Sequence, residues 1–521
     1  MTIPLSRAPG IPALALGHAT GEPDVTEFLP RVSSLSGIAA QAAAVRSAFR
    51  RRALPAGADP RLAEHARAGR AVVLTGQQAG LFGGPHLTLA KAVAAEKLAA
   101  DLSAAGAPAA GVFWCASEDH DLVEVTRVVL PTPEGPRDFG PDPAAFSGNR
   151  APVGGLPIAA DVGAILGAAV AGLGGPPDED ALAALAGAHA GATYRDAFVK
   201  TLGWLLGDAL PVADAADAAD KPALVPLAVR LVKERRKVRE LLGTRDEALA
   251  KAGHSLQVKT DAAALPLFVR TEGERLLLVE DAGRLALKGR EGTFSEEEAV
   301  ARLEGGAWLP SFSALTRPLA ASVLYPVGAT VLGPAEVAYW AQAWPLFAWA
   351  DIVPPAVLLR PLVALETPGV RRLLAKLEVT LAEVLEGEEA LLRRMGAGSA
   401  RALLARVAAV RDEAAAGLDA LRPELLAVDA SLERAVAATK EKLGFSFQKL
   451  VEKTEAAAGR SDARVTQQVR RLCVELLPEG QLAERQYSVL PYVLKLGREA
   501  VVGALRRDLK WDVPGIQEIP L

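Results

Sequence analysis

Short apolar runs, glycine-rich turns and helical repeats alternate in the first part of the chain. The segment 71–74 is a short apolar run, as expected of a strand that is covered on both faces of a sheet. A glycine-rich turn follows, and Pro85 suits the first position of a helix. Apolar residues then recur at three- and four-residue steps, which predicts a helix over 85–102. Because 110–115 is again a short apolar run, the segment 71–115 predicts a βαβ unit.

The turn between this strand and this helix contains several glycines. Gly76, Gly80 and Gly84 allow positive φ angles and close approach of another backbone. The free N–H groups at the helix start favour an anion. The spacing fits neither the phosphate-binding loop, because no Gly-Lys-Ser/Thr follows, nor a dinucleotide fingerprint. Ordinary turn chemistry and ligand binding therefore both remain open for this turn.

Four ionisable residues directly follow the second apolar run: Glu118, Asp119, His120 and Asp121. Ligands of open parallel sheets bind beyond the carboxyl ends of the strands, so these side chains lie where a site is expected. One interpretation is a solvated loop whose acidic residues open a helix. The other is an acid/base site in which His120 transfers a proton and Asp119 or Asp121 orients its ring. Zinc is disfavoured, since no second His or Cys stands at ligand spacing.

The remaining pattern predicts an α/β core that is interrupted by inserts. The expected elements are a helix at 37–52, a connecting segment at 131–177, a helix at 194–206, a strand at 209–213, an acidic surface loop at 214–220, a charged helix at 229–251, an antiparallel meander at 267–288, a return to the core sheet at 323–332 and an aromatic helix at 339–349. The expected boundaries are 1–130 for the first part of the core, 131–190 for a connecting insert, 191–255 for the core continuation, 256–305 for the small β-meander insert, 306–365 for the later core, 366–476 for a helical arm and 477–521 for a segment that docks on the core.

The arm is predicted from its hydrophobic period. Apolar residues from Val370 and again from Ala414 step alternately by four and three, which is the 3.5-residue period of supercoiled helices. We expect a helical hairpin over about 368–476, interrupted near Gly396 and Pro423. Such an arm usually packs on another chain, so the sequence predicts a homodimer.

Composition narrows the class of protein. The chain has 521 residues, half of them apolar, and a formal net charge of −4, which allows a large core. Lys and Arg are spread along the chain, so no basic stripe indicates nucleic acid. The two cysteines, Cys115 and Cys473, are too few for a disulfide framework and fit a reducing cytoplasm. No apolar run reaches the roughly twenty residues of a membrane span, and the start lacks a signal-peptide layout. We expect a cytoplasmic protein that binds no membrane.

Several segments taken together resemble one known family. These are 75–80, 84–85, 112–114, 116–121, 317–319 and 333–342, and they resemble the bacillithiol biosynthesis cysteine-adding enzymes. The resemblance covers nearly the whole chain, including the arm and Glu484-Arg485. It departs at Ser313, Ala335 and Ala483, where the family tends to have Asn, Gly and Gln.

The resemblance implies a Rossmann-like parallel-sheet core with connecting inserts and a long coiled-coil arm that pairs two subunits. It also implies that L-cysteine is joined to glucosaminyl-malate by an amide bond, giving bacillithiol. A carboxylate needs activation before it reacts with an amine, and ATP or another nucleotide is the usual agent. We therefore expect an activated cysteinyl intermediate whose phosphate lies over the turn at 76–86. No metal is expected.

Residue chemistry then suggests roles in such a reaction. The expected catalytic residues are His120, Asp119, Asp121 and His86; the expected substrate-binding residues are Thr75, Gln77, Gln78, Glu118, Arg317 and Glu336; the expected nucleotide-binding residues are Gly76, Gly80, Gly84, Arg485 and Tyr487. His120 is the candidate base that takes a proton from the attacking amine. Arg317 and Arg485 suit carboxylates or phosphates, although structural ion pairs would also explain them.

Two other functions stay open at this point. The chain could be a nucleotidyltransferase-like enzyme that activates another acid and stops there. It could also be an inactive dimeric scaffold, although acidic residues at two separate strand ends argue against that.

Overall fold

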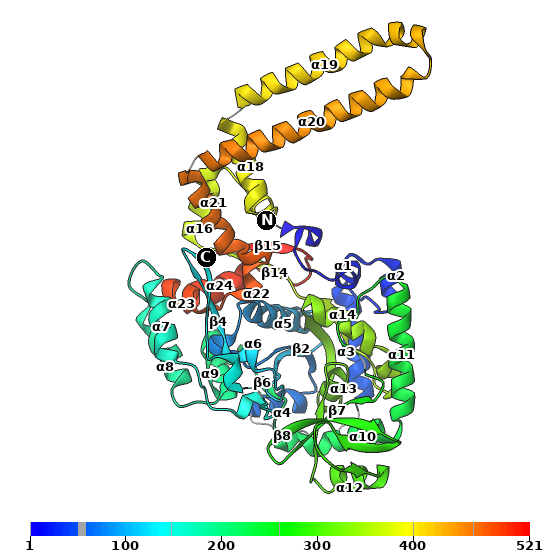
Figure 1. The fold of residues 1–521 in the computed structure, drawn as a ribbon. Coiled ribbons are helices and arrows are strands. Elements are labelled where there is room, and N and C mark those ends of the chain that lie inside the picture. The colour runs from blue at the N-terminus through cyan, green and yellow to red at the C-terminus, as the bar shows by residue number, and fades with distance from the viewer. Residues whose placement is uncertain (1, 50–58, 147, 260, 400, 462) are drawn as a thin grey trace. The chain divides into compact units, whose positions relative to one another are not determined.

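The computed structural model describes residues 2–49, 59–146, 148–259, 261–399, 401–461 and 463–521 (Figure 1). The chain forms two compact units. The first consists of Met1–Thr132, Pro136–Thr367 and Leu482–Leu521, and the second of Pro133–Gly135 and Pro368–Gln481.

The first unit is built on a five-stranded parallel sheet. Its strands lie in the order β13 (Ala356–Leu359), β12 (Val327–Leu332), β2 (Ala71–Gln77), β3 (Ala109–Cys115) and β6 (Val212–Asp214). Within this sheet, the chain first forms the central strand β2 and then the strands β3 and β6 on one side of it. It then returns to the other side of β2 with β12 and continues to β13. The order of the strands thus reverses between β2 and β12, and this Rossmann-like topology opens a crevice at the carboxyl ends of these two strands.

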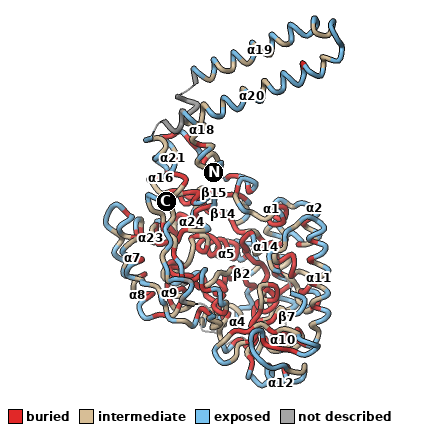
Figure 2. Tube along the Cα trace, in the orientation of Figure 1, coloured by how far each residue is buried: buried red, intermediate tan, exposed pale blue. Residues whose placement is uncertain are grey.

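Two apolar layers cover the faces of this sheet, because alternate strand residues point to opposite faces. Val73 and Phe113 belong to one layer, and Val72 and Val112 to the other. The first layer includes α3 (Leu35–Ala48), α5 (Leu87–Ala104), α9 (Tyr194–Leu206), α23 (Leu490–Leu496) and α24 (Arg498–Asp508). The second includes α1 (Ala13–Thr20), α2 (Pro23–Thr26), α4 (Pro60–Arg67), α10 (Lys221–Lys233), α11 (Arg235–Lys251), α13 (Arg317–Leu324), α14 (Pro334–Ala343) and α15 (Pro345–Trp349). Figure 2 shows β2 and α5 as buried elements inside this unit.

Inserts and the chain ends complete the first unit. The segment after β3 forms α6 (Leu122–Thr126), β4 (Val128–Thr132), β5 (Gly135–Phe139), α7 (Val162–Ala171) and α8 (Glu179–His189). The later insert is an antiparallel sheet in the order β10 (Thr293–Phe294), β9 (Arg284–Leu287), β8 (Glu274–Asp281), β7 (Ala264–Thr271) and β11 (Leu309–Phe312), with α12 (Glu296–Glu304). The end of the chain forms α22 (Ala483–Gln486) and β15 (Ile516–Pro520), and β15 pairs with both β1 (Thr2–Ile3) and β14 (Leu362–Glu366).

The second unit is helical. It contains α16 (Pro368–Leu377), α17 (Leu381–Val384), α18 (Glu388–Ser399), α19 (Arg401–Val428), α20 (Leu432–Ser461) and α21 (Ala463–Leu476). The long helices α19 and α20 form a hairpin, and ion pairs such as Lys440–Asp419 at 2.6 Å link the two helices. Pro423 lies inside α19, so the predicted interruption there is wrong, and the hairpin turns after Val428 instead. No helix of the described residues combines the length and apolarity needed to cross a membrane.

The structure corrects several local predictions. The helix predicted at 37–52 begins at Leu35 and ends at Ala48, while 50–52 lie outside the described residues. The charged helix predicted at 229–251 is the end of α10 followed by α11, with the break at Glu234. The segment 214–220 is not a free surface loop: Asp214 accepts a hydrogen bond from Ser117, and Asp220 is buried.

Candidate active site

A cavity of about 440 Å³ lies at the crevice between the carboxyl ends of β2 and β12. Its wall comes from segments that are far apart in the sequence. It is lined by Leu74, Thr75, Gly76, Gln77, Gln78, Leu87, Lys91, Trp114, Ala116, Asp119, Glu124, Ala314, Arg317, Pro318, Ala321, Thr330, Leu332, Gly333, Pro334, Ala335, Glu336, Tyr339, Trp340, Arg360 and Arg485. Its place at the strand-order reversal, and its size, are typical of a ligand site in this kind of sheet.

A buried lysine organises one part of the cavity wall. The Nζ atom of Lys91 donates to the carbonyl of Gly76 at 2.8 Å and to Oε1 of Gln77 at 3.1 Å, and lies 2.5 Å from Oε2 of Glu336. Burial lowers the pKa of Lys91, while the carboxylate of Glu336 opposes that shift. Glu336 also accepts a hydrogen bond from the N–H of Gly333 at the start of α14. Lys91 therefore positions Gln77 and Glu336.

Asp119 is held between two arginines. Its Oδ1 lies 2.5 Å from Nη2 of Arg317 and 3.6 Å from Nη2 of Arg275, and its Oδ2 accepts from Nε2 of Gln78 at 3.5 Å. Burial alone would raise the pKa of Asp119, but Arg317 and Arg275 outweigh burial and the pKa lies below its usual value. Asp119 is therefore a fixed negative charge that orients Arg317 and Gln78.

His120 faces an arginine rather than a carboxylate. Its Nδ1 lies 3.1 Å from Nη1 of Arg275. A guanidinium group only donates, so Nδ1 accepts and the ring proton lies on Nε2. Burial and then the charge of Arg275 lower the pKa of His120, although Asp119 and Asp121 oppose this. His120 does not line the cavity, and this geometry favours a neutral hydrogen-bond donor over the base that the sequence suggested.

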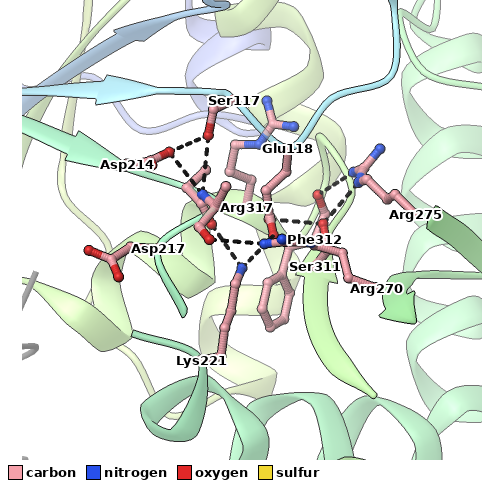
Figure 3. A network of polar contacts seen from close by, with 12 residues as sticks. Ser117, Glu118, Asp214, Asp217, Lys221, Arg270, Arg275, Ser311, Phe312 and Arg317 are labelled. Carbon is pink, nitrogen blue, oxygen red and sulfur yellow. Dashed lines mark hydrogen bonds and ion pairs between the residues drawn. The ribbon is translucent and has the colours of Figure 1, made fainter. Parts of the chain in front are cut away.

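Asp121 and Glu118 also have structural partners. Asp121 is exposed and caps α6 by accepting from the N–H of Val123 at 3.2 Å, so it does not orient His120. Glu118 is buried and is not among the residues that line the cavity. Its Oε1 lies 2.5 Å from Nζ of Lys221, and its Oε2 accepts from Ser311 at 2.9 Å (Figure 3). Because its charge is already neutralised, the geometry does not support the expected substrate contact of Glu118.

The turn between β2 and α5 is closed by the chain itself. The N–H and Nδ1 of His86 both contact the carbonyl oxygen of Tyr487, at 2.8 and 3.1 Å. Burial lowers the pKa of His86 to about 3, so its ring stays neutral. A Cβ added to Gly80 would lie 3.0 Å from Cα of Gly84, so these glycines permit close packing of the turn. The backbone N–H of His86, the residue that precedes α5, is therefore already bonded to the carbonyl of Tyr487.

Eight of the residues that the sequence suggested come together in the cavity wall. They are Thr75, Gly76, Gln77, Gln78, Asp119, Arg317, Glu336 and Arg485. The hydroxyl of Thr75 donates to the carbonyl of Val331 at 2.8 Å, which ties β2 to β12. The guanidinium of Arg485 forms no hydrogen bond or ion pair with the described residues, so it is available to an anion.

Sequence reasoning missed other residues of the wall. Lys91, Trp114, Glu124, Tyr339 and Arg360 also line the cavity. A single lysine on the otherwise apolar face of the helix at 85–102 was the one signal that could have drawn attention to Lys91. Among the described residues, no cluster of three or more His, Cys, Asp or Glu is arranged to hold a metal ion.

The parallel sheet, the polar cavity at its strand-order reversal and the helical hairpin together define a Rossmann-like enzyme that carries a coiled coil. Two family models match the chain: the N-terminal Rossmann-like domain of bacillithiol biosynthesis BshC over residues 51–361, and its C-terminal coiled-coil domain over residues 363–508. The chain therefore belongs to the BshC family of bacillithiol biosynthesis, and it is a ligase.

Curated relatives agree with this assignment. The chain is 31% identical to a protein of Solibacter usitatus over 84% of this chain and 82% of the relative. It is 31% identical to one of Koribacter versatilis over the same shares, and 32% identical to one of Thermus thermophilus over 84% of this chain and 86% of the relative. All three are named "Putative cysteine ligase BshC".

Proposed function

We propose that this ligase joins the carboxyl group of L-cysteine to the amine of glucosaminyl-malate, as the last step of bacillithiol formation. One observation carries the proposal: a single cavity combines carboxylates, at Asp119, Glu124 and Glu336, with the guanidinium of Arg485, which has no partner among the described residues. A zwitterionic amino acid and a sugar bearing a dicarboxylate need both kinds of partner. The family membership and the names of the relatives support the choice of cysteine.

The contacts that each cavity residue already makes indicate which residues bind substrate and which shape the cavity. Arg485 has no partner among the described residues and suits a malate carboxylate or a phosphate by paired N–H donors. The buried Oε1 of Gln78 has no hydrogen-bond partner in the described part of the chain and suits an ammonium group. Arg317 and Glu336 are already paired with Asp119 and Lys91, so we assign them to shaping the wall and tuning its charge.

We propose that a nucleoside triphosphate binds in the same cavity. Trp114 lines the cavity and its buried Nε1–H lacks a partner among the described residues, and Arg485 is the cation that we assign to an anionic group. When bound, ATP or another nucleotide would supply the activation that makes the cysteine carboxyl group reactive toward an amine. The chain's own residues hold the two substrates in one cavity and shield them from water.

Purified protein supplied with L-cysteine, glucosaminyl-malate and ATP should form the amide, identified by mass after thiol labelling. Reactions without ATP, or with L-serine in place of L-cysteine, are the controls and should give little product. Nucleotide products are measured in the same samples. Nucleotide turnover without amide formation would favour the alternative of a nucleotidyltransferase-like enzyme, and neither reaction would favour an inactive scaffold.

We also propose that the hairpin of α19 and α20 pairs two copies of the chain. Most of the large apolar side chains that are exposed among the described residues lie on these two helices: Leu403, Val410, Leu421, Val428, Phe445 and Leu450. Helices with such a stripe are covered by a partner helix in coiled coils. Because both Cys115 and Cys473 are free and buried, the cytoplasm is the compartment that we propose for this dimer.

Replacing Leu421 and Phe445 together by Glu should convert the protein to a monomer, because two charges would have to be buried in each copy of the interface. Sedimentation equilibrium at micromolar concentration measures this. Lys259→Glu, an exposed change outside the arm, is the control and should stay dimeric. A wild-type protein that sediments as a monomer would rule out the dimer.

A further inference from the structure

The cavity contains three carboxylates, and two of them already have strong partners. Asp119 lies against Arg317 and Arg275, and its pKa is lowered, so it is a poor proton acceptor. Glu336 lies 2.5 Å from Nζ of Lys91 and accepts from the backbone at the start of α14. Glu124 also lines the cavity, and its carboxylate forms no hydrogen bond or ion pair with the described residues.

The position of Glu124 is fixed by the short helix α6. Leu122 and Val125 are buried in the apolar layer of α5 and anchor α6 from one side. Asp121 caps the start of the same helix. A Cβ added to Gly80 would lie 4.0 Å from the carbonyl oxygen of Glu124, so the glycine turn after β2 lies directly beside α6. The backbone thus holds Glu124 at the cavity wall while its side chain stays solvent-accessible.

The surroundings of Glu124 raise its affinity for a proton. The protein atoms around its carboxyl group partly desolvate it, and the negative charges of Asp121 and then Asp119 add to the effect, so the pKa of Glu124 lies above its usual value. A base works best when its pKa approaches the working pH. The pKa of Glu124 is therefore shifted toward that range, whereas the pKa of Asp119 is shifted away from it.

His120, the residue suggested by the sequence, is less suited to the task. Its Nδ1 is occupied by the N–H of Arg275, and its Nε2 carries the ring proton. If the ring accepted a proton, the Nδ1–H of His120 would face the N–H of Arg275. Two donors would then oppose each other, because a guanidinium group has no acceptor.

We propose that Glu124 is the general base of the ligation, an assignment that rests on the proposed function. The nitrogen of the glucosamine amine attacks the activated carbonyl carbon of cysteine and the N–C bond forms. The bond between that carbon and its oxygen leaving group breaks, and the leaving group departs with the electron pair. The proton of the attacking nitrogen passes to the carboxylate of Glu124, which returns it to water after the product leaves.

The test compares Glu124→Gln with His120→Asn in the complete protein. Glu124→Gln keeps the shape of the side chain but cannot accept the proton, so kcat should fall by about 10²- to 10⁴-fold while KM changes by less than about threefold. Glu124→Asp should restore part of the loss. His120→Asn should lower kcat by about tenfold or less. The acid limb of the wild-type pH profile of kcat should be absent in Glu124→Gln.

Two outcomes would overturn the assignment. One is a Glu124→Gln protein whose kcat stays within about threefold of wild type. The other is a much larger loss in His120→Asn than in Glu124→Gln, which would return the role of base to His120.

A second measurement does not depend on the identity of the substrates. In protein labelled with ¹³C at the Glu carboxyl carbons, the signal missing from Glu124→Gln identifies Glu124, and its titration gives the pKa. We expect a pKa above the ordinary value of about 4.3, and a value at or below it would refute the assignment. Failure to form the amide with wild-type protein, together with a raised pKa of Glu124, would instead count against the proposed substrates alone.

Discussion

Replacing Glu484 by Gln should lower the free energy of unfolding by about 3–5 kcal/mol. Glu484 is 0% exposed and Arg360 is 2% exposed. The two guanidinium nitrogens Nη1 and Nη2 donate to the two carboxylate oxygens at 2.8 and 2.7 Å, and the N–H of Val363 donates to the same carboxylate at 2.9 Å. Gln would leave the charge of Arg360 buried without its counter-charge, and a buried unpaired charge is among the costliest changes in a core. Urea unfolding followed by circular dichroism measures the loss.

Two further variants show whether the cost comes from the unpaired charge. Glu274→Gln removes the same charge from the more exposed ion pair with Arg290 and should change stability by less than about 1 kcal/mol. The double variant Arg360→Met/Glu484→Leu removes both charges and should recover much of the stability lost in Glu484→Gln. Equal losses in the single and double variants would show that packing, and not charge, explains the effect.

Replacing Asp119 by Asn should lower kcat/KM by about 10²- to 10³-fold. Arg317 and Arg275 both lie near its Oδ1, so loss of the carboxylate would leave two cations facing each other at the cavity. Charge-assisted hydrogen bonds contribute about 1.5–3 kcal/mol each, and each 1.36 kcal/mol lost from the transition state is about tenfold in rate. Steady-state kinetics of amide formation measure the loss. Asp281→Asn, an exposed change at the end of β8, is the control and should match wild type.

The same aspartate should make folding stability depend on pH. Its pKa is lowered in the folded protein, so the unfolded chain binds the proton more tightly than the folded chain. The contribution of Asp119 is therefore complete above the unfolded value, about 3.9, and is lost as the pH falls from there through the lower folded value. Thermal unfolding between pH 5 and acid conditions should show a shallower decline for Asp119→Asn than for wild type, and parallel curves would contradict this.

Local patterns predicted the elements of the core well, because the period of apolar residues depends on which faces are buried. The strand at 110–115 and the helix at 194–206 lie where the sequence indicated, as β3 and α9. The break between α10 and α11 at Glu234 does not interrupt the period of apolar residues, because both helices have an apolar face. The sequence therefore predicted one continuous helix there. A proline inside a helical pattern predicts a break, yet α19 continues through Pro423.

The partners of the charged residues could not be predicted in this way. Asp119 and His120 are adjacent in sequence, but both contact Arg275, which is more than 150 residues away on the β-meander insert. Likewise Glu118 pairs with Lys221, the first residue of α10, directly after the segment 214–220 that composition alone describes as an acidic loop. These long-range contacts decide which carboxylate is neutralised and which, like Glu124, has no partner among the described residues. A linear sequence does not record them.

The cavity wall includes Arg485, and β15 near the end of the chain pairs with β14, so the first unit needs residues that lie on both sides of the arm. During synthesis on the ribosome, β2, β3 and β12 are available long before Arg485 emerges. The nascent enzyme must therefore keep an unfinished sheet edge in water while more than a hundred residues of helix are translated. A stop codon anywhere in the arm yields a chain that lacks both Arg485 and β15, the middle strand between β1 and β14, so premature termination produces no partly active enzyme.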